Sequence, residues 1–195
     1  MLYTVMRFIG LFIRCCLMRL VMVGRENLTA GNTLFVCNHL SSLDAAIQFS
    51  VLPRHTHFMA KKELFRNRLN GWFLRRAHTF PIDRQSVDLK AIKEATGLLS
   101  AGKDLCIFPQ GTRCKNVLIS AEQMHSGIGM IALRAHSRII PMMFTARPRL
   151  FHKNTLMIGE PLDLSAFAAE KINSQTIHAF SEAVRAGMNR LIEKP

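Results

Sequence analysis

Acidic residues are scarce in this 195-residue chain, since 13 Asp and Glu stand against 26 Lys and Arg and give a formal net charge of +13. There is also no sequence repeat and no low-complexity tract, which excludes the fibrous classes. Hydrophobic residues make up 49% of the chain, which excludes an intrinsically disordered protein. The length fits one domain with its own core. A chain of this charge favours an anionic partner: nucleic acid, an anionic membrane surface or a phosphorylated substrate.

Cysteines are few and are not spaced for metal binding or for a disulfide framework. The chain has five of them, an odd number, and no CxxC pair. This excludes a zinc ribbon and predicts no structural metal. Such cysteine usage favours a reducing, intracellular compartment.

Long uninterrupted apolar runs are absent as well. Residues 1–23 are rich in apolar side chains, but Arg7, Arg14 and Arg19 interrupt them, and arginine near the centre of a spanning helix is costly. The segment also lacks the small-residue cleavage site of a removable signal peptide. We therefore predict that residues 1–23 form an amphipathic, interfacial membrane helix whose arginines snorkel toward the headgroups. A basic helix packed on the core is the alternative.

The rest of the chain alternates short apolar runs with segments of helical spacing. Strands are predicted at residues 33–37, 56–60, 78–83, 104–108, 139–144 and 155–159. Helices are predicted at 43–52 after a Ser41 or Ser42 cap, at 61–69 before a break at Gly71, between a Ser86 cap and Gly102, at 128–136 and at 174–193. Pro141 suggests that its strand is an edge strand or irregular. The alternation predicts an α/β fold, with residues 24–195 forming a single mixed, largely parallel sheet flanked by helices.

The first candidate site is CNHLSSLD, which follows one predicted strand and enters a helix. It contains His39 and Asp44, five residues apart. On a regular helix the two side chains would point in different directions, but a strand-to-helix turn brings Asp44 back under His39. A carboxylate on one ring nitrogen leaves the other free to accept a proton, so the pair predicts a general base. A capping Asp beside a core histidine is the alternative explanation of this spacing.

The second candidate site is IFPQGTR at residues 107–113, again directly after a predicted strand. Gly111 allows close approach of the backbone, Thr112 offers a hydroxyl group, and Arg113 offers a planar set of donors. These groups suit a phosphate at the carboxyl end of a strand. An ordinary turn with a surface arginine is the alternative.

Together the two motifs resemble those of the glycerolipid acyltransferases, the 1-acyl-glycerol-3-phosphate (lysophosphatidic acid) acyltransferase family. The family pattern NHxSxxD matches Asn38, His39, Ser41 and Asp44, and FPEGTR matches 108–113 except at Gln110. Further similarities lie in AKKEL (60–64), FPIDR (80–84), HSG (125–127), RIIPM (138–142) and IGEPL (158–162). The resemblance covers about residues 24–165.

The resemblance implies a catalytic base, His39, oriented by Asp44. It also implies an acceptor-binding set, which comprises Lys61, Arg84, Gln110, Gly111, Thr112 and Arg113. The implied reaction moves an acyl group from a thioester to the free hydroxyl group of 1-acyl-glycerol-3-phosphate, giving phosphatidic acid. We expect no bound cofactor, and the expected co-substrate is acyl-CoA or acyl-acyl-carrier protein. Acyl-carrier protein is acidic, and the basic segment 61–76 suits it.

The expected partners are an anionic membrane surface and a lysophospholipid, and the expected location is the cytoplasmic face of the inner (plasma) membrane. Nucleic acid is not expected, because neither motif serves it. Gln110 departs from the usual Glu by losing a negative charge, which leaves two alternatives open. One is a different acceptor, such as another lysophospholipid or a lyso-aminolipid. The other is a non-catalytic, membrane-associated protein of the same fold, against which His39 and Asp44 argue.

Overall fold

The strands and helices alternate along the chain as the sequence predicts. The computed structural model describes residues 2–53, 55–167 and 169–193, in which seven strands form one sheet. The strands are β1 (Arg19–Val23), β2 (Thr33–Cys37), β3 (His57–Lys61), β4 (Thr79–Ile82), β5 (Leu105–Ile107), β6 (Arg138–Phe144) and β7 (Lys153–Ile158). The α-helices are α1 (Leu2–Phe12), α2 (Leu43–Val51), α3 (Arg68–Arg76), α4 (Leu89–Ser100), α5 (Gly127–Ala135) and α6 (Ser174–Glu193).

The sheet is mixed and largely parallel, which confirms the predicted fold class. Its strand order is β1-β7-β6-β2-β5-β3-β4. Neighbouring strands run parallel except for the β6–β7 pair, which is antiparallel. The four strands β2, β5, β3 and β4 are therefore adjacent and end at the same edge, the arrangement in which α/β sheets bind ligands.

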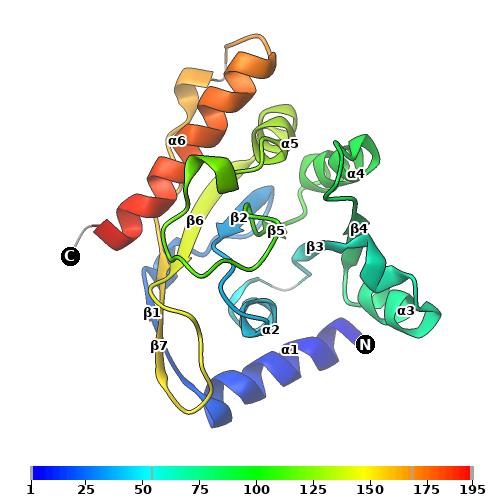
Figure 1. Cartoon of the computed structure of the whole chain (residues 1–195), viewed down its shortest axis with the longest axis vertical. Helices are drawn as coiled ribbons and strands as arrows, with labels where there is room; N and C mark the ends of the chain where they lie inside the picture. The colour runs from blue at the N-terminus through cyan, green and yellow to red at the C-terminus, as the bar shows by residue number, and fades with distance from the viewer. Residues whose placement is uncertain (1, 54, 168, 194–195) are drawn as a thin grey trace.

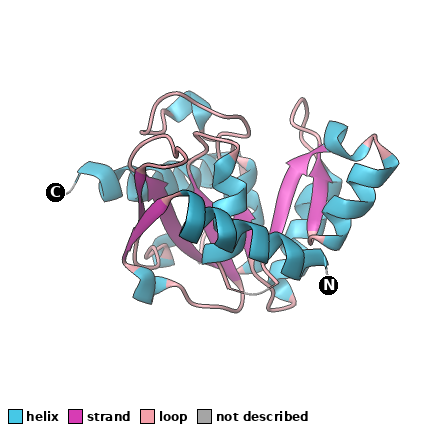
Figure 2. Cartoon of the chain, turned by 90° about the horizontal axis from the view of Figure 1, so that it is seen from below, coloured by secondary structure: helices cyan, strands magenta, loops and turns pink. Residues whose placement is uncertain are grey.

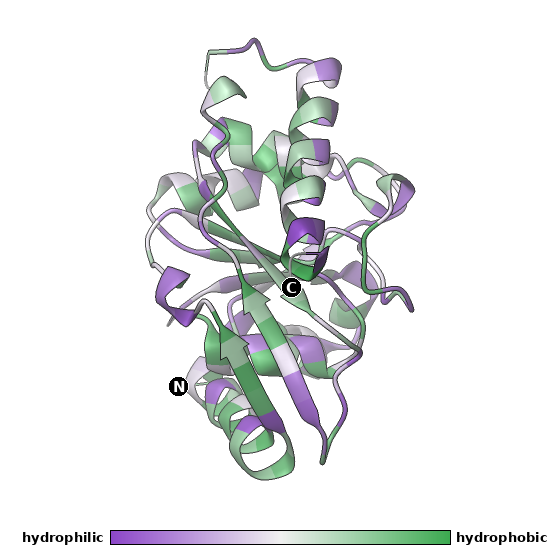
Figure 3. Ribbon diagram, turned by 90° about the vertical axis from the view of Figure 1, so that its left-hand side faces the viewer, coloured by the Kyte–Doolittle hydropathy of each residue, from purple (hydrophilic) through white to green (hydrophobic). Residues whose placement is uncertain are grey.

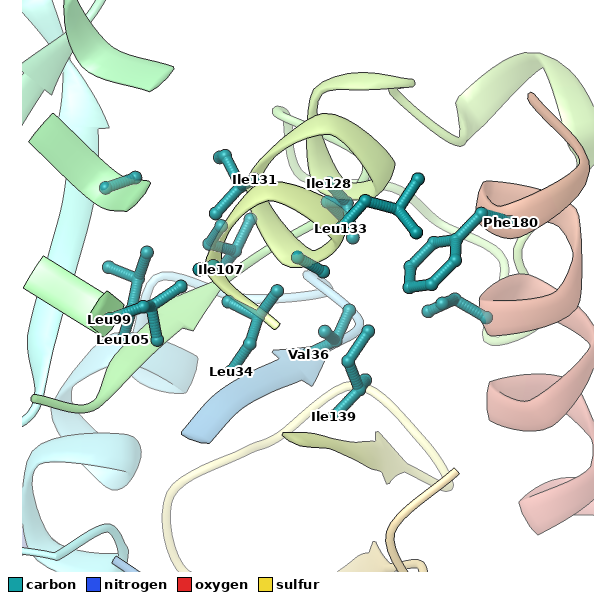
Figure 4. Close-up of a cluster of buried hydrophobic side chains, with 14 of the residues drawn as sticks. Leu34, Val36, Leu99, Leu105, Ile107, Ile128, Ile131, Leu133, Ile139 and Phe180 are labelled. Carbon is teal, nitrogen blue, oxygen red and sulfur yellow. The ribbon is translucent and has the colours of Figure 1, made fainter. Parts of the chain in front are cut away.

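Helices cover both faces of the sheet (Figure 1). Because side chains alternate along a strand, Leu34 and Val36 of β2 join one core cluster, while Phe35 and Cys37 join the other. The first cluster packs against α4, α5 and α6, as Figure 4 shows for Ile128 and Phe180. The second packs against α1 and α2, and Figure 2 shows α1 crossing this face. The site residues thus project from the edge of a sheet held rigidly from both sides.

The N-terminal segment differs from the single helix predicted for residues 1–23. After α1, residues Ile13–Leu17 form a π-helical turn, and Arg19–Val23 form β1, which pairs in parallel with β7 (Figure 3). Residue 1 lies outside the described residues. In the described part of the chain, no helix is both long and apolar enough to cross a bilayer. The prediction of membrane contact therefore concerns α1 and the turn that follows it.

Arg7 does not snorkel outward as predicted. Its Nη1 donates to the carbonyl oxygens of Leu52, at 2.8 Å, and Phe49, at 3.4 Å. These carbonyls lie at the C-terminal end of α2, where a cation is favourable. Arg7 therefore fastens α1 to α2, and Gly10 lets the two helices approach closely, because a Cβ there would lie 2.2 Å from the carbonyl oxygen of Ala46.

Two smaller expectations were wrong, and of the two explanations offered for Pro141 the edge strand is excluded. Gly71 does not end the basic helix but lies inside α3, which begins after Asn67, whose side chain accepts from the N–H groups of Leu69 and Asn70. Asp88, not Ser86, caps α4 by accepting from the N–H of Ala91. Pro141 is not on an edge strand, because β6 lies between β2 and β7. Pairing of β6 with β7 begins only at Met142, so the proline costs little there.

Candidate active site

The predicted contact between His39 and Asp44 is present. Nδ1 of His39 lies 2.8 Å from Oδ2 of Asp44, and the two side chains are 16% and 0% exposed. Since a carboxylate only accepts, Nδ1 carries the proton and Nε2 is left as the acceptor. The same Oδ2 accepts from the backbone N–H groups of Leu40 at 2.6 Å and Ser41 at 2.7 Å. Asp44, in the first turn of α2, is thus fixed before it orients the imidazole.

Gln110 holds the backbone of His39 in place. Its Oε1 accepts from the His39 N–H at 2.7 Å, and the N–H of Cys114 donates to the His39 carbonyl oxygen at 2.8 Å. Gln110 is only 3% exposed, so its side chain faces His39 rather than solvent. The turn after β5 and the turn after β2 are therefore joined on both sides of the histidine.

Phe108 and Asn38 complete this support, and neither was assigned a role from the sequence. The ring of Phe108 stacks on His39 with centroids 4.4 Å apart. Asn38, fully buried, accepts from the N–H of Phe144 at 2.8 Å and donates to the carbonyls of Phe144 and Val117. It thereby ties the end of β2 to the end of β6. Their position in the sequence could have indicated this supporting role, because both residues directly follow a buried strand.

The remaining predicted residues meet at the same edge of the sheet. Lys61 is the last residue of β3, Arg84 follows β4, and Gly111, Thr112 and Arg113 follow β5. The loop that carries Arg113 is anchored farther along, where Asn189 of α6 bonds both the N–H and the carbonyl of Ile119 at 3.0 Å. Arg113 and Lys61 are exposed cations, and Nζ of Lys61 lies 3.9 Å from Oε2 of Glu63.

A cavity of about 400 Å³ opens beside this edge. Its lining includes Arg84, Gly111 and His125, and partial burial lowers the pKa of Arg84. Gly111 has a φ of +62°, and a Cβ there would lie 2.9 Å from Nε2 of His125. Only glycine meets both requirements without strain. Much of the lining is apolar and includes Met59, Ile82, Ile92, Ile107, Ile128 and Ile131.

Within the described residues, no cluster of three or more His, Cys, Asp or Glu side chains is arranged to hold a metal ion. The geometry instead offers one oriented base, exposed cations and an apolar cavity. This set suits proton removal from the hydroxyl group of an amphiphilic anion.

Comparison with known proteins identifies the family. The Acyltransferase family model matches residues 19–145. The 1-acyl-sn-glycerol-3-phosphate acyltransferase of Bacillus subtilis (strain 168) is 32% identical over 178 residues, which cover 88% of this chain and 87% of that protein. The enzyme of the same name from Streptococcus pneumoniae is 31% identical over 170 residues, covering 84% of this chain and 61% of that protein.

The fold is also that of a solved structure. The crystal structure of the 1-acyl-sn-glycerophosphate (LPA) acyltransferase PlsC from Thermotoga maritima matches with a TM-score of 0.70, covering 98% of this chain and 78% of that one. At 21% identity this likeness shows the fold alone. The family model and the sequence relatives show the family as well as the fold. The chain is an O-acyltransferase and belongs to the acyltransferase family that includes the 1-acyl-sn-glycerol-3-phosphate acyltransferases.

Proposed function

We propose that this chain transfers a fatty acyl group from an acyl thioester to the free hydroxyl group of 1-acyl-glycerol-3-phosphate, giving phosphatidic acid in phospholipid synthesis. The observation that carries the proposal is the 2.8 Å pair of His39 and Asp44 at the same sheet edge as the FPQGTR turn. The names of the B. subtilis and S. pneumoniae relatives supply the acceptor. The proposal requires no bound cofactor, because the thioester is already activated.

In the proposed reaction, Nε2 of His39 removes the proton as the acceptor oxygen attacks the thioester carbonyl carbon. The new C–O bond forms, the tetrahedral intermediate collapses, and the C–S bond breaks. The departing thiolate takes the proton back from the imidazolium, so the thiol leaves and the base is regenerated. Asp44 stabilises the imidazolium between these steps. No covalent acyl-enzyme is needed.

Arg113, Arg84 and Lys61 bind the acceptor phosphate in this proposal, with Gly111 and Thr112 supplying close backbone approach and a hydroxyl group. Lys61 is the last residue of β3, Arg84 follows β4, and Arg113 lies in the loop after β5, so all three come from the same edge of neighbouring strands. A phosphate monoester there replaces solvent as their partner, and an arginine binds it through two parallel hydrogen bonds.

Gln110 has a different role from the cations. The sequence placed it in the acceptor-binding set, but its buried side chain contacts the backbone of His39. We propose that it positions the base. Because the side chain at position 110 contacts His39 and not the acceptor in this proposal, the replacement of Glu by Gln gives no reason to expect an acceptor that lacks a phosphate monoester.

Location and donor are part of the same proposal. We propose that the enzyme lies on the cytoplasmic face of the inner membrane. Membrane contact is supported by α1, which turns Phe8, 65% exposed, and Phe12, 57% exposed, away from the core. The lysolipid acceptor resides in that membrane, and acyl-CoA or acyl-carrier protein delivers the acyl group from the aqueous side.

Acyl transfer from labelled donors tests the proposal directly. Assays with 1-acyl-glycerol-3-phosphate, with 1-acyl-glycerol and with lysophosphatidylcholine distinguish a phosphate monoester from other headgroups. We expect Arg113→Ala to raise the KM for 1-acyl-glycerol-3-phosphate far more than the KM for the donor, because a charge-assisted contact is lost. Arg134→Ala on α5, also exposed, is the matched control. An equal Arg113→Ala defect on all acceptors contradicts the phosphate role, and absence of transfer to any lysolipid contradicts the function.

A further inference from the structure

Helix α3 and the turn before it leave large apolar side chains in solvent. Leu69 is 79% exposed, Trp72 is 54% exposed, and Leu64 in the 3₁₀ turn η3 (Lys62–Phe65) is 50% exposed. In α3 itself only Gly71 is buried. Leu69 and Trp72 are three residues apart and therefore lie on one side of the helix. A nine-residue helix that leaves Leu69 and Trp72 in solvent presents an apolar surface of the kind that contacts a partner or a membrane.

The same segment is strongly basic. Residues 61–76 contain six Lys and Arg residues and one acidic residue, Glu63. Arg66 and Arg68 are exposed, and the guanidinium of Arg76 lies 5.3 Å from the centroid of the Trp72 ring. The contacting surface is therefore anionic. Charge attraction would serve an acidic carrier protein as well, but an anionic bilayer pairs with the arginines and also accepts the exposed apolar side chains between them. Tryptophan also prefers the bilayer–water interface.

The position of α3 also favours the bilayer. Helix α3 contacts α1, whose exposed side chains include Val5, Phe8, Ile9 and Phe12. Figure 1 shows the N-terminal end of α1 approaching the region of α3. Two neighbouring elements with apolar residues turned to solvent can engage one flat surface together.

The turn η3 is also joined to the candidate active site. Lys62 forms an ion pair with Asp83, which lines the cavity next to Arg84. A bilayer held by α3 therefore lies near the cavity rim. This location suits an acceptor that enters from the membrane.

We propose that residues 64–76, which we name the α3 arm, form a second membrane contact that binds an anionic bilayer surface beside α1. The arm inserts Leu69 and Trp72 at the interface while its arginines pair with lipid headgroups. This inference does not depend on acyl transfer, because its readout is binding.

Trp72 is the only tryptophan of the chain, so its fluorescence reports on the α3 arm alone. The full-length protein is mixed with vesicles of phosphatidylcholine containing one third phosphatidylglycerol. We expect the emission to shift to the blue and to be quenched by lipids brominated on their acyl chains. Protein that sediments with the vesicles while its emission stays unchanged overturns the proposal, because α1 then binds alone. Failure to sediment also overturns it, as does a shift caused by acyl-carrier protein and not by vesicles.

A charge reversal tests the arginines without touching the fluorophore. Arg66→Glu with Arg68→Glu changes two exposed side chains, and glutamate is well tolerated at the start of a helix. We expect binding to these vesicles to weaken about tenfold or more, since each basic residue near an anionic surface contributes substantially. The matched control is Lys90→Glu with Lys93→Glu, both exposed on α4 of the opposite face. Equal weakening by both pairs overturns the proposal.

Discussion

At the scale of single residues, the oriented imidazole of His39 is the group on which turnover depends. We expect His39→Ala to lower kcat by about 10²–10⁴ while the protein still folds, which is the usual contribution of a general base. Asp44→Asn should also be severe, because an amide does not fix the same tautomer. His178→Ala, at an exposed position of α6, is the control. Steady-state kinetics with circular dichroism check this, and near-normal turnover in folded His39→Ala contradicts the mechanism.

A second residue-scale prediction concerns Gln110 as the residue that positions His39. Gln110→Leu removes the acceptor of the His39 N–H, and a buried unsatisfied donor costs about 1–3 kcal/mol of stability. We expect kcat to fall with little change in the acceptor KM. Gln110→Glu retains an acceptor oxygen and should stay active. Thermal unfolding and kinetics of both variants distinguish this role, because a rise in acceptor KM without a fall in kcat would indicate a substrate contact.

At the scale of elements, α1 depends on one small residue for its contact with α2. A Cβ at Gly10 would lie 2.2 Å from the carbonyl oxygen of Ala46, so we expect Gly10→Ala to push α1 away and to cost about 1–3 kcal/mol. Gly97→Ala is the matched control, because a Cβ on that residue of α4 meets no atom within 4 Å. It should stabilise the protein by about 0.5–1 kcal/mol. Trypsin cleavage at Arg7 and Arg14 should be faster in Gly10→Ala than in either wild type or control.

The sequence predicted the elements whose signal is local. The buried strand at residues 33–37 matches the structure residue for residue, and the last helix, expected from a Ser174 cap to about Glu193, spans Ser174–Glu193, because a short β-branched run and a 3.6-residue spacing are local patterns. Asn173, not Ser174, accepts from the N–H of Thr176 at the start of this helix. Strand β1 could not be predicted in this way. Its RLVMV run continues the apolar character of α1, and its conformation is decided by pairing with β7, far away in the sequence.

The candidate site shows the same division between local and distant contacts. The turn that joins His39 to Asp44 spans five residues, so the motif predicted the contact that the structure confirms. The bond from Gln110 to His39 and the stacking of Phe108 on His39 join two loops about 70 residues apart. These contacts depend on β2 and β5 being neighbours, which the spacing of motifs does not specify.

At the scale of the whole molecule, stability should depend on pH through a group of histidines beneath α1. The rings of His55, His57 and His78 stack near Tyr3, with His57 and His78 centroids 5.0 Å apart. Burial is the main cause that lowers the pKa of both His57 and His78, and the charges of His55 and Lys103 act on both in the same direction. The charge of His78 also lowers the pKa of His57, while a backbone hydrogen bond at each ring opposes the shift. Protonation of His57 and His78 is therefore less favourable in the folded protein than in the unfolded chain.

The sign of the pH effect follows from proton binding. Unfolded histidine has a pKa of about 6.5, so below that pH the unfolded chain binds more protons than the folded one, and stability falls as pH falls. We expect the free energy of unfolding in urea to decrease between about pH 7.5 and pH 5.5. His78→Asn should reduce this dependence, and asparagine tolerates the φ of +59° at that position. A pH dependence identical in wild type and His78→Asn contradicts the assignment.

Membrane association is the second property of the whole molecule, and its dependence on salt separates two physical causes. The net charge of +13 attracts anionic lipid, but salt screens that attraction. Burial of apolar side chains is not screened, and Phe8 and Phe12 of α1 are 65% and 57% exposed in the free protein. We therefore expect the protein to stay on anionic vesicles in high salt, and Phe8→Asp with Phe12→Asp to release it there. Leu89→Asp with Ile172→Asp changes two exposed apolar residues away from α1 and should bind as wild type does. Complete release of the wild-type protein by salt alone would show that α1 does not insert. The attraction between the protein and the vesicles would then be entirely electrostatic.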